Sequence, residues 1–204
     1  AYAPRYDHRY QYDGVGNTVQ LTSSDGPVQS FSNIFTATGD ETIEAVAFYT
    51  NDVDVEYSIQ VYTEIPEQGN PSSGKKALSK AQTGTQNYAG YHTVELNRPI
   101  DVEKGERFAI VISLEHPEDS EKYEIAVEAS FSNIGNRKSG TVSIEEGQSF
   151  CWTQSGWVDF IEIAEEEGTD EISFGNLCLK ALTVDRSSNS GDSDHSSSSG
   201  ESSG

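Results

Sequence analysis

Residues 56–63, EYSIQVYT, decide the fold class, because their side chains alternate with a period of two. Tyr57, Ile59 and Val61 fall on one face of an extended chain, and the residues between them fall on the other face. This period is typical of a β-strand that buries one of its faces. We therefore expect a half-buried strand here, and similar runs recur along the chain.

Further strands are expected where short runs of β-branched and aromatic residues are bounded by polar turns. These runs lie at residues 31–36, 44–50, 92–96, 107–114, 123–128, 140–144, 157–163 and 177–184. The turns contain Gly, Asn, Asp and Pro, which favour chain reversals. No segment has a convincing helical pattern, and residues 74–82 are interpreted as a loop that enters a strand. The sequence predicts an all-β protein, an antiparallel, jelly-roll-like β-sandwich.

The charge of the chain excludes one class of partner. The 204 residues include 13 Lys and Arg against 34 Asp and Glu, which gives a formal net charge of −21. Phosphates would be repelled, so we do not expect nucleic acid as a partner. No run of about 18 apolar residues is present, so no membrane span is predicted, and residues 1–20 lack the apolar region of a signal peptide. The charge suits an extracellular or cell-surface location.

Composition divides the chain into three parts. Residues 187–204 are rich in Ser and lack apolar residues, so we expect a flexible linker or tail. Residues 15–186 carry the strand pattern and are predicted to form one β-sandwich domain. Residues 1–14 are interpreted as an N-terminal joining segment.

The segment 150–160, FCWTQSGWVDF, contains both Trp residues and one of two Cys residues. A Cys-Trp pair also occurs at the nucleophile of papain-type peptidases, where a helix N-terminus and a His partner generate the thiolate. Here the residues after Cys151 favour strands, and the only downstream His is His195, in the Ser-rich tail. We therefore predict a β-hairpin that turns near Ser155-Gly156, and no catalytic residue in this chain.

Metal ligands do not occur at recognisable spacings. The four His residues form neither a His-x₃-His nor a His-Glu-x-x-His motif, so no metal site is predicted. Acidic clusters are expected by chance in so acidic a chain, and none completes a calcium-binding loop. No cofactor is predicted, and a structural calcium ion is an alternative that the sequence does not place.

Aromatic side chains are the candidates for ligand contacts, because a flat ring can stack on the apolar face of a sugar. The alternative is packing in the core or at its rim, which we expect for at least half of them. The ligand-binding candidates are Tyr62, Tyr88, Tyr91, Trp152 and Trp157.

Six segments occur in an order that matches a known family. They are YDHRYQYDG (6–14), NIFTATGDETIEAVAFYT (33–50), YSIQVYT (57–63), YAGYHTVELNRPIDVEKGERFAIVI (88–112), GQSFCWTQSGWVDF (147–160) and NLCLKALT (176–183). Together they resemble the lectin-like domain that follows the catalytic domain in secreted papain-type (C1-family) cysteine peptidases of anaerobic bacteria and archaea. The resemblance implies an extracellular or surface-linked β-sandwich accessory domain with an upstream peptidase domain as its partner. The catalytic Cys, His and Asn of such proteins belong to that upstream domain, so none is transferred to this chain.

The resemblance also bears on two local features. Compared with the family hairpin, Cys151 looks like a local substitution, which leaves Cys178 either as a plain buried thiol or as the disulfide partner of Cys151. In the family, the segment 6–14 lies where the peptidase ends and the sandwich begins. Its tyrosines share one face, which can dock on the peptidase or on the sandwich itself. The candidates for an interdomain contact are Tyr6, His8, Tyr10 and Tyr12.

Three functions are compatible with these observations. The leading hypothesis is a non-catalytic lectin-like module that holds a secreted cysteine peptidase near a carbohydrate or cell-surface target. The alternative is a structural domain that packs on the peptidase and stabilises or gates it. An enzyme that uses paired carboxylates or Cys151 is the least favoured reading.

Overall fold

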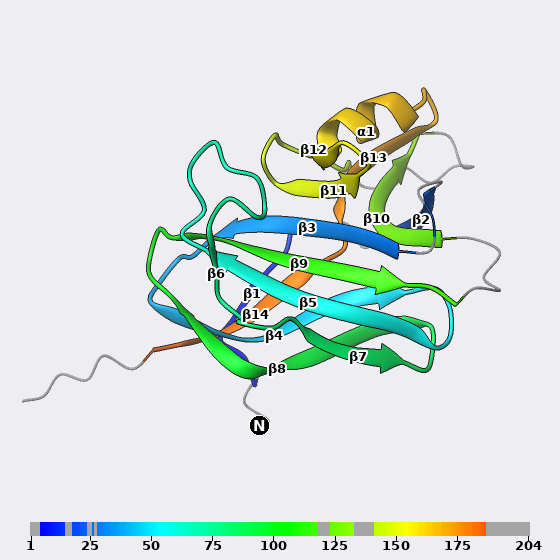
Figure 1. Cartoon of the computed structure of the whole chain (residues 1–204). Helices are drawn as coiled ribbons and strands as arrows, with labels where there is room; N and C mark the ends of the chain where they lie inside the picture. The colour runs from blue at the N-terminus through cyan, green and yellow to red at the C-terminus, as the bar shows by residue number, and fades with distance from the viewer. Residues whose placement is uncertain are drawn as a thin grey trace, which may run out of the picture.

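The protein is an antiparallel β-sandwich, as the alternation predicts (Figure 1). The computed structural model describes residues 5–14, 18–23, 26, 28–117, 123–132 and 141–186. Within these ranges, fourteen strands form three sheets, and one short helix lies beside them. The predicted tail, residues 187–204, lies outside the described residues.

The largest sheet has seven strands in the order β12-β11-β3-β9-β5-β6, with β7 paired on β5. The segment 56–63 forms most of β5, and Ile59 and Val61 are fully buried, as expected. Gln60 on the opposite face is also buried, because its side chain bonds the backbone of Leu78. The strands of this sheet are β3 (Val28–Thr36), β5 (Val55–Thr63), β6 (Lys75–Lys76), β7 (Gln82–Gln86), β9 (Arg107–Glu115), β11 (Ser149–Thr153) and β12 (Gly156–Asp159).

A four-stranded sheet forms the second layer, in the order β1-β14-β4-β8 (Figure 1). Val46 and Phe48 of β4 point inward and share one core cluster with Ile59 and Ile110 from the seven-stranded sheet. Alternation then directs Ala45, Ala47 and Tyr49 to the outer face. The strands are β1 (His8–Tyr10), β4 (Glu41–Thr50), β8 (Gly90–Val102) and β14 (Lys180–Asp185).

A three-stranded sheet and the helix close one end of the sandwich (Figure 1). The strands are β2 (Thr18–Ser23), β10 (Tyr123–Phe131) and β13 (Ile172–Leu177), and the helix is α1 (Phe160–Glu167). The strand expected at 157–163 is therefore wrong beyond Asp159. The Asp159 side chain accepts a hydrogen bond from the Ile161 amide and caps the helix, while Phe160 and Ala164 are buried on one helical face.

Two other strand predictions need correction. The described residues 141–144 form no strand, although Val142 is buried. The run expected at 177–184 is divided, because Leu177 ends β13 and Lys180 begins β14 in another sheet. The Asn33 amide donates to the carbonyls of Leu177 and Leu179, and so holds the chain where it crosses between the sheets.

Candidate ligand-binding groove

A groove runs over the outer face of the four-stranded sheet. Two adjoining hollows of about 320 and 580 Å³ share Arg9, Gln11 and Tyr91 in their linings. Ala45 and Ala47 of β4 are fully buried on this face, and the hollows are lined by the larger side chains around them. We call this feature the tyrosine groove; its side chains used below are Arg9, Gln11, Asp13, Tyr49, Tyr91 and Lys180.

The aromatic wall of the groove comes from two paired strands. Tyr49 on β4 and Tyr91 on β8 lie opposite each other in register, and their rings are 5.0 Å apart at 57°. Burial raises the pKa of Tyr49, and negative charge on nearby groups, including Asp13, raises it further. The Tyr49 hydroxyl therefore keeps its proton at neutral pH, where it can donate a hydrogen bond.

A buried ion pair lies at one end of the groove. The Lys180 ammonium bonds Asp13 Oδ2, and the two side chains are only 9% and 8% exposed. Asp13 Oδ1 has no hydrogen-bond partner in the described part of the chain. With the exposed Arg9 and Gln11, this end offers both donors and acceptors beside an aromatic ring. Hydroxyl groups and an apolar ring face are the two features of a sugar that such a surface can contact.

The five aromatic candidates are divided between two places. Tyr91 lines the tyrosine groove, and Tyr88 is 78% exposed in the turn just before β8. That turn ends at Gly90, whose φ of +132° suits glycine. Tyr62, Trp152 and Trp157 lie elsewhere, on the seven-stranded sheet.

The predicted hairpin places the two Trp residues directly opposite each other. Trp152 on β11 pairs in register with Trp157 on β12, and their rings meet edge to face at 5.4 Å and 81°. Trp157 and Tyr62 are partly buried against an apolar cluster, and Trp157 Nε1 donates to Ser72 Oγ at 3.1 Å. Trp152 alone of these three is strongly exposed, at 53%.

Trp152 borders a pocket of about 190 Å³ between α1 and strands β2, β3, β10 and β11. Leu21, Ile125, Phe160 and Cys151 line this Trp152 pocket together with polar side chains, among them Gln29 and Glu167. Burial raises the pKa of Cys151 to about 12, so the thiol stays protonated and is a poor nucleophile. Cys151 and Cys178 are both buried and are not joined by a disulfide bond in the structure.

The N-terminal segment packs on this domain rather than standing away from it. Tyr10 lies edge to face with Phe108 at 5.4 Å. Tyr12 stacks on Phe35 at 5.0 Å and donates to the carbonyl of Ile34. Burial raises the pKa of Tyr12 to about 12. The sequence left two docking surfaces possible, the peptidase and the sandwich. Tyr10 and Tyr12 pack on the sandwich, while Tyr6 borders the tyrosine groove.

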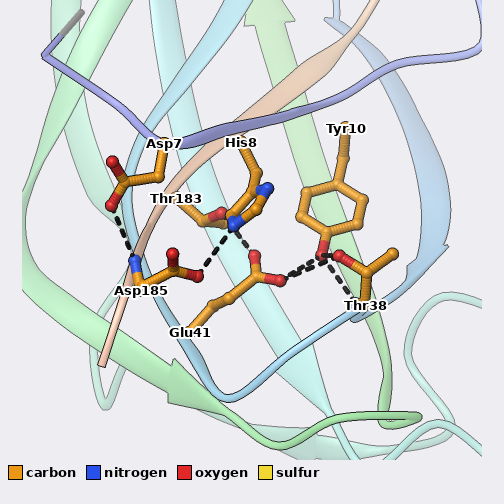
Figure 2. A network of polar contacts seen from close by, with 7 residues as sticks. All are labelled: Asp7, His8, Tyr10, Thr38, Glu41, Thr183 and Asp185. Carbon is orange, nitrogen blue, oxygen red and sulfur yellow. Dashed lines mark hydrogen bonds and ion pairs between the residues drawn. The ribbon is translucent and has the colours of Figure 1, made fainter. Parts of the chain in front are cut away.

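A polar network fastens the same segment (Figure 2). His8 Nε2 lies 2.7 Å from Asp185 Oδ1, and this contact is the main cause that raises the pKa of His8. Glu41 is fully buried, and its carboxylate accepts hydrogen bonds from the hydroxyls of Tyr10, Thr38 and Thr183. Burial alone would raise the pKa of Glu41, but these hydrogen bonds outweigh it and lower the pKa.

Sequence reasoning missed Tyr49, Asp13 and Lys180. Asp13 and Lys180 are separated by 167 residues, and no local pattern connects them. Tyr49 carried a signal that was available, because it lies on the opposite face of its strand from Val46 and Phe48.

Comparisons with known proteins agree with this fold. The model of the lectin-like domain family matches residues 9–183. The clostridial cysteine protease Cwp84 after propeptide cleavage has a TM-score of 0.64 and 20% identity, over 88% of this chain and 40% of that chain. A structure of the cysteine protease and lectin-like domains of Cwp84, a surface layer associated protein of Clostridium difficile, has a TM-score of 0.59 and 19% identity, over 82% of this chain and 34% of that one.

This chain therefore spans less than half the length of those two chains. No curated protein sequence matches. The described part of the chain has no helix of the length and apolar character needed to cross a membrane. Because the family model covers most of its residues, the chain belongs to the family of lectin-like domains.

Proposed function

We propose that this domain is a non-catalytic accessory module of a cysteine peptidase and that it binds carbohydrate through the tyrosine groove. The observation that carries the proposal is the groove itself. Two tyrosine rings lie beside a guanidinium, an amide and a buried ion pair on an open sheet face. This combination matches a ligand with apolar ring faces and many hydroxyls.

The two similar solved structures support the peptidase context. Both contain a cysteine protease, and one is described with its lectin-like domain as a surface-layer associated protein. By analogy, the domain holds a secreted peptidase at a cell surface, where its ligand is a polysaccharide of the envelope. The strongly acidic chain disfavours polyanionic glycans as ligands.

A glycan array and a cell-envelope pull-down test the binding. The protein is expected to bind one group of neutral or basic glycans and to sediment with the envelope fraction. Arg9→Ala removes an exposed hydrogen-bonding group of the groove, and it should weaken both signals. Lys104→Ala is a matched control, because it removes an exposed cation from the turn between β8 and β9. No binding to any glycan or envelope fraction, or equal loss in both variants, would overturn the proposal.

The second candidate function is structural, and the network around His8 favours it. Because β1 is held to β14 by side-chain and backbone contacts, a domain attached before it would join a fixed strand. The test compares the peptidase alone with the same peptidase joined to this domain. A higher melting temperature or an altered rate of casein cleavage in the joined protein supports the structural role. Unchanged values in both measurements contradict it.

A further inference from the structure

Three potential metal ligands meet where three strands of the four-stranded sheet come together (Figure 2). His8 lies on β1, Glu41 is the first residue of β4, and Asp185 is the last residue of β14. One donor atom from each lies within 4.8 Å of the others. Glu41 and Asp185 are distant from His8 in sequence, so no ligand spacing could have revealed the cluster.

The carboxylate of Glu41 is oriented before any ion arrives. Tyr10 and Thr38 donate to Oε1 at 2.7 and 3.0 Å, and Thr183 donates to Oε2. Such outer contacts are what fix the orientation of ligands in metal sites. Asp185 is held from its backbone, because its amide donates to the Asp7 carboxylate at 2.9 Å.

The cluster contains more negative than positive charge. Two carboxylates face a single imidazole, and the Asp7 carboxylate lies close by. The described contacts of these side chains include no Lys or Arg. A buried carboxylate is stabilised by a cation or by several hydrogen bonds. Glu41 has the hydrogen bonds, and a bound cation would in addition balance the excess negative charge of Glu41, Asp185 and Asp7.

We infer that His8, Glu41 and Asp185 form a binding site for a divalent transition-metal ion of the zinc class. One nitrogen and two oxygens suit Zn²⁺ or Co²⁺, whereas Ca²⁺ prefers six to eight oxygens. Ligand atoms around a tetrahedral zinc ion lie ~3.4 Å apart, given bonds of ~2.1 Å. The contact of 2.7 Å between His8 and Asp185 must therefore lengthen, which their exposed side chains (39% and 66%) permit. Water completes the coordination from the exposed side.

The ion would join the N-terminal strand to two strands of the domain body. It replaces a hydrogen bond between His8 and Asp185 with bonds from one centre to β1, β4 and β14. His8 also lines one hollow of the tyrosine groove, but the test below measures metal binding directly and needs no bound sugar.

Binding of Zn²⁺ and Co²⁺ by the whole chain tests the inference. Isothermal titration should show one Zn²⁺ per chain at this site, and Co²⁺ should give the visible absorption of a tetrahedral complex. His8→Ala and Asp185→Asn should each weaken binding by about tenfold or more. Asp185 is well exposed, so the second variant keeps the fold; melting temperatures measured in chelator check this. His195→Ala is the matched control, because it removes the His of the Ser-rich tail, and it should leave binding unchanged.

Three results would overturn the site. They are the absence of stoichiometric Zn²⁺ binding by the wild-type chain, equal affinity in all variants, and loss of binding only in His195→Ala. Displacement of Zn²⁺ by a modest excess of Ca²⁺ would overturn the assigned metal class.

Discussion

The tyrosine groove and the Trp152 pocket both present aromatic rings, but their ring pairs are built from contacts of different range in the sequence. The groove is assembled across β1, β4, β8 and β14, and its ion pair joins residues 167 positions apart. The ring pair at the pocket, Trp152 and Trp157, comes from one hairpin, although β2, β3 and β10 also line the pocket. Within residues 147–161, Asp159 bonds the amides of both Gly147 and Ile161.

The two exposed rings, Tyr91 and Trp152, differ in the charged groups beside them. Tyr91 lies among a guanidinium, an amide and an ion pair, which can satisfy the hydroxyls of a ligand. Trp152 is exposed to a similar degree, yet the described lining of its pocket contains no Lys or Arg and a single carboxylate, that of Glu167. Exposure alone is therefore a weak guide to a sugar site.

The largest expected effect on stability comes from breaking the ion pair between Lys180 and Asp13. Lys180→Met leaves the Asp13 carboxylate buried without its cation, and it should lower the free energy of unfolding by about 3–5 kcal/mol. Urea unfolding measures the change. The double variant Lys180→Met/Asp13→Leu removes both charges and should recover most of the loss. A loss below about 1 kcal/mol in the single variant would show that water reaches the pair and that the groove is not built around it.

Breaking the contacts of Asp159, which are local in sequence and lie near the Trp152 pocket, should lower the free energy of unfolding by less. Asp159→Ala removes the cap of α1 and the acceptor for Gly147, so we expect a loss of about 1–2 kcal/mol in urea unfolding. Asp159→Asn retains a capping oxygen and serves as the control. Equal losses in the two variants would mean that the charge of Asp159, rather than the hydrogen-bond geometry, stabilises this end.

Ligand binding gives the next comparison. Tyr91→Ala should weaken the affinity for a bound glycan between about two- and tenfold, because stacking of an aromatic ring contributes ~0.5–1.5 kcal/mol. Trp152→Ala should leave the affinity unchanged, although it removes the larger exposed ring. Titration calorimetry with one glycan measures both. The reverse result would move the site to the Trp152 pocket.

The same difference in range explains what the sequence could predict. Alternation identified β5, β9 and the inner face of β4, because one strand alone reveals its buried face. The hairpin was also correct, since Gly156, with φ of +102°, occupies the turn that its residue type favours. The helix was missed, although apolar residues at 160, 161, 163 and 164 have helical spacing and follow an Asp that can cap.

The groove could be predicted only in part. Tyr91 was a candidate because an exposed aromatic in a strand is visible in sequence. In the sequence, Asp13 and Lys180 resemble ordinary surface charges, and only the pairing of β1 with β14 brings them together. Long-range register of this kind leaves no local signal in a single sequence.

The smallest effect depends on pH and concerns His116, on the same side as the Trp152 pocket. His116 is 3% exposed and contacts Tyr123 at the start of β10, a strand that lines that pocket. Neither ring nitrogen has a hydrogen-bond partner among the described residues, whereas the buried Lys180 in the groove is paired. Burial lowers the pKa of His116 below its ordinary value of 6.5, and Asp52 and Glu124 oppose this shift.

Protonation of His116 is therefore more favourable in the unfolded chain than in the folded chain. The contribution of His116 to stability is complete above about pH 6.5 and is lost as the pH falls through the lower pKa of the folded state. His116→Phe keeps a ring against Tyr123 but cannot be protonated. Between about pH 7 and pH 5, its free energy of unfolding should fall less than that of the wild type. If the free energy of unfolding falls equally with pH in the variant and the wild type, water or a charged neighbour already stabilises protonated His116. The contrast between the paired Lys180 and the unpaired His116 would then be wrong.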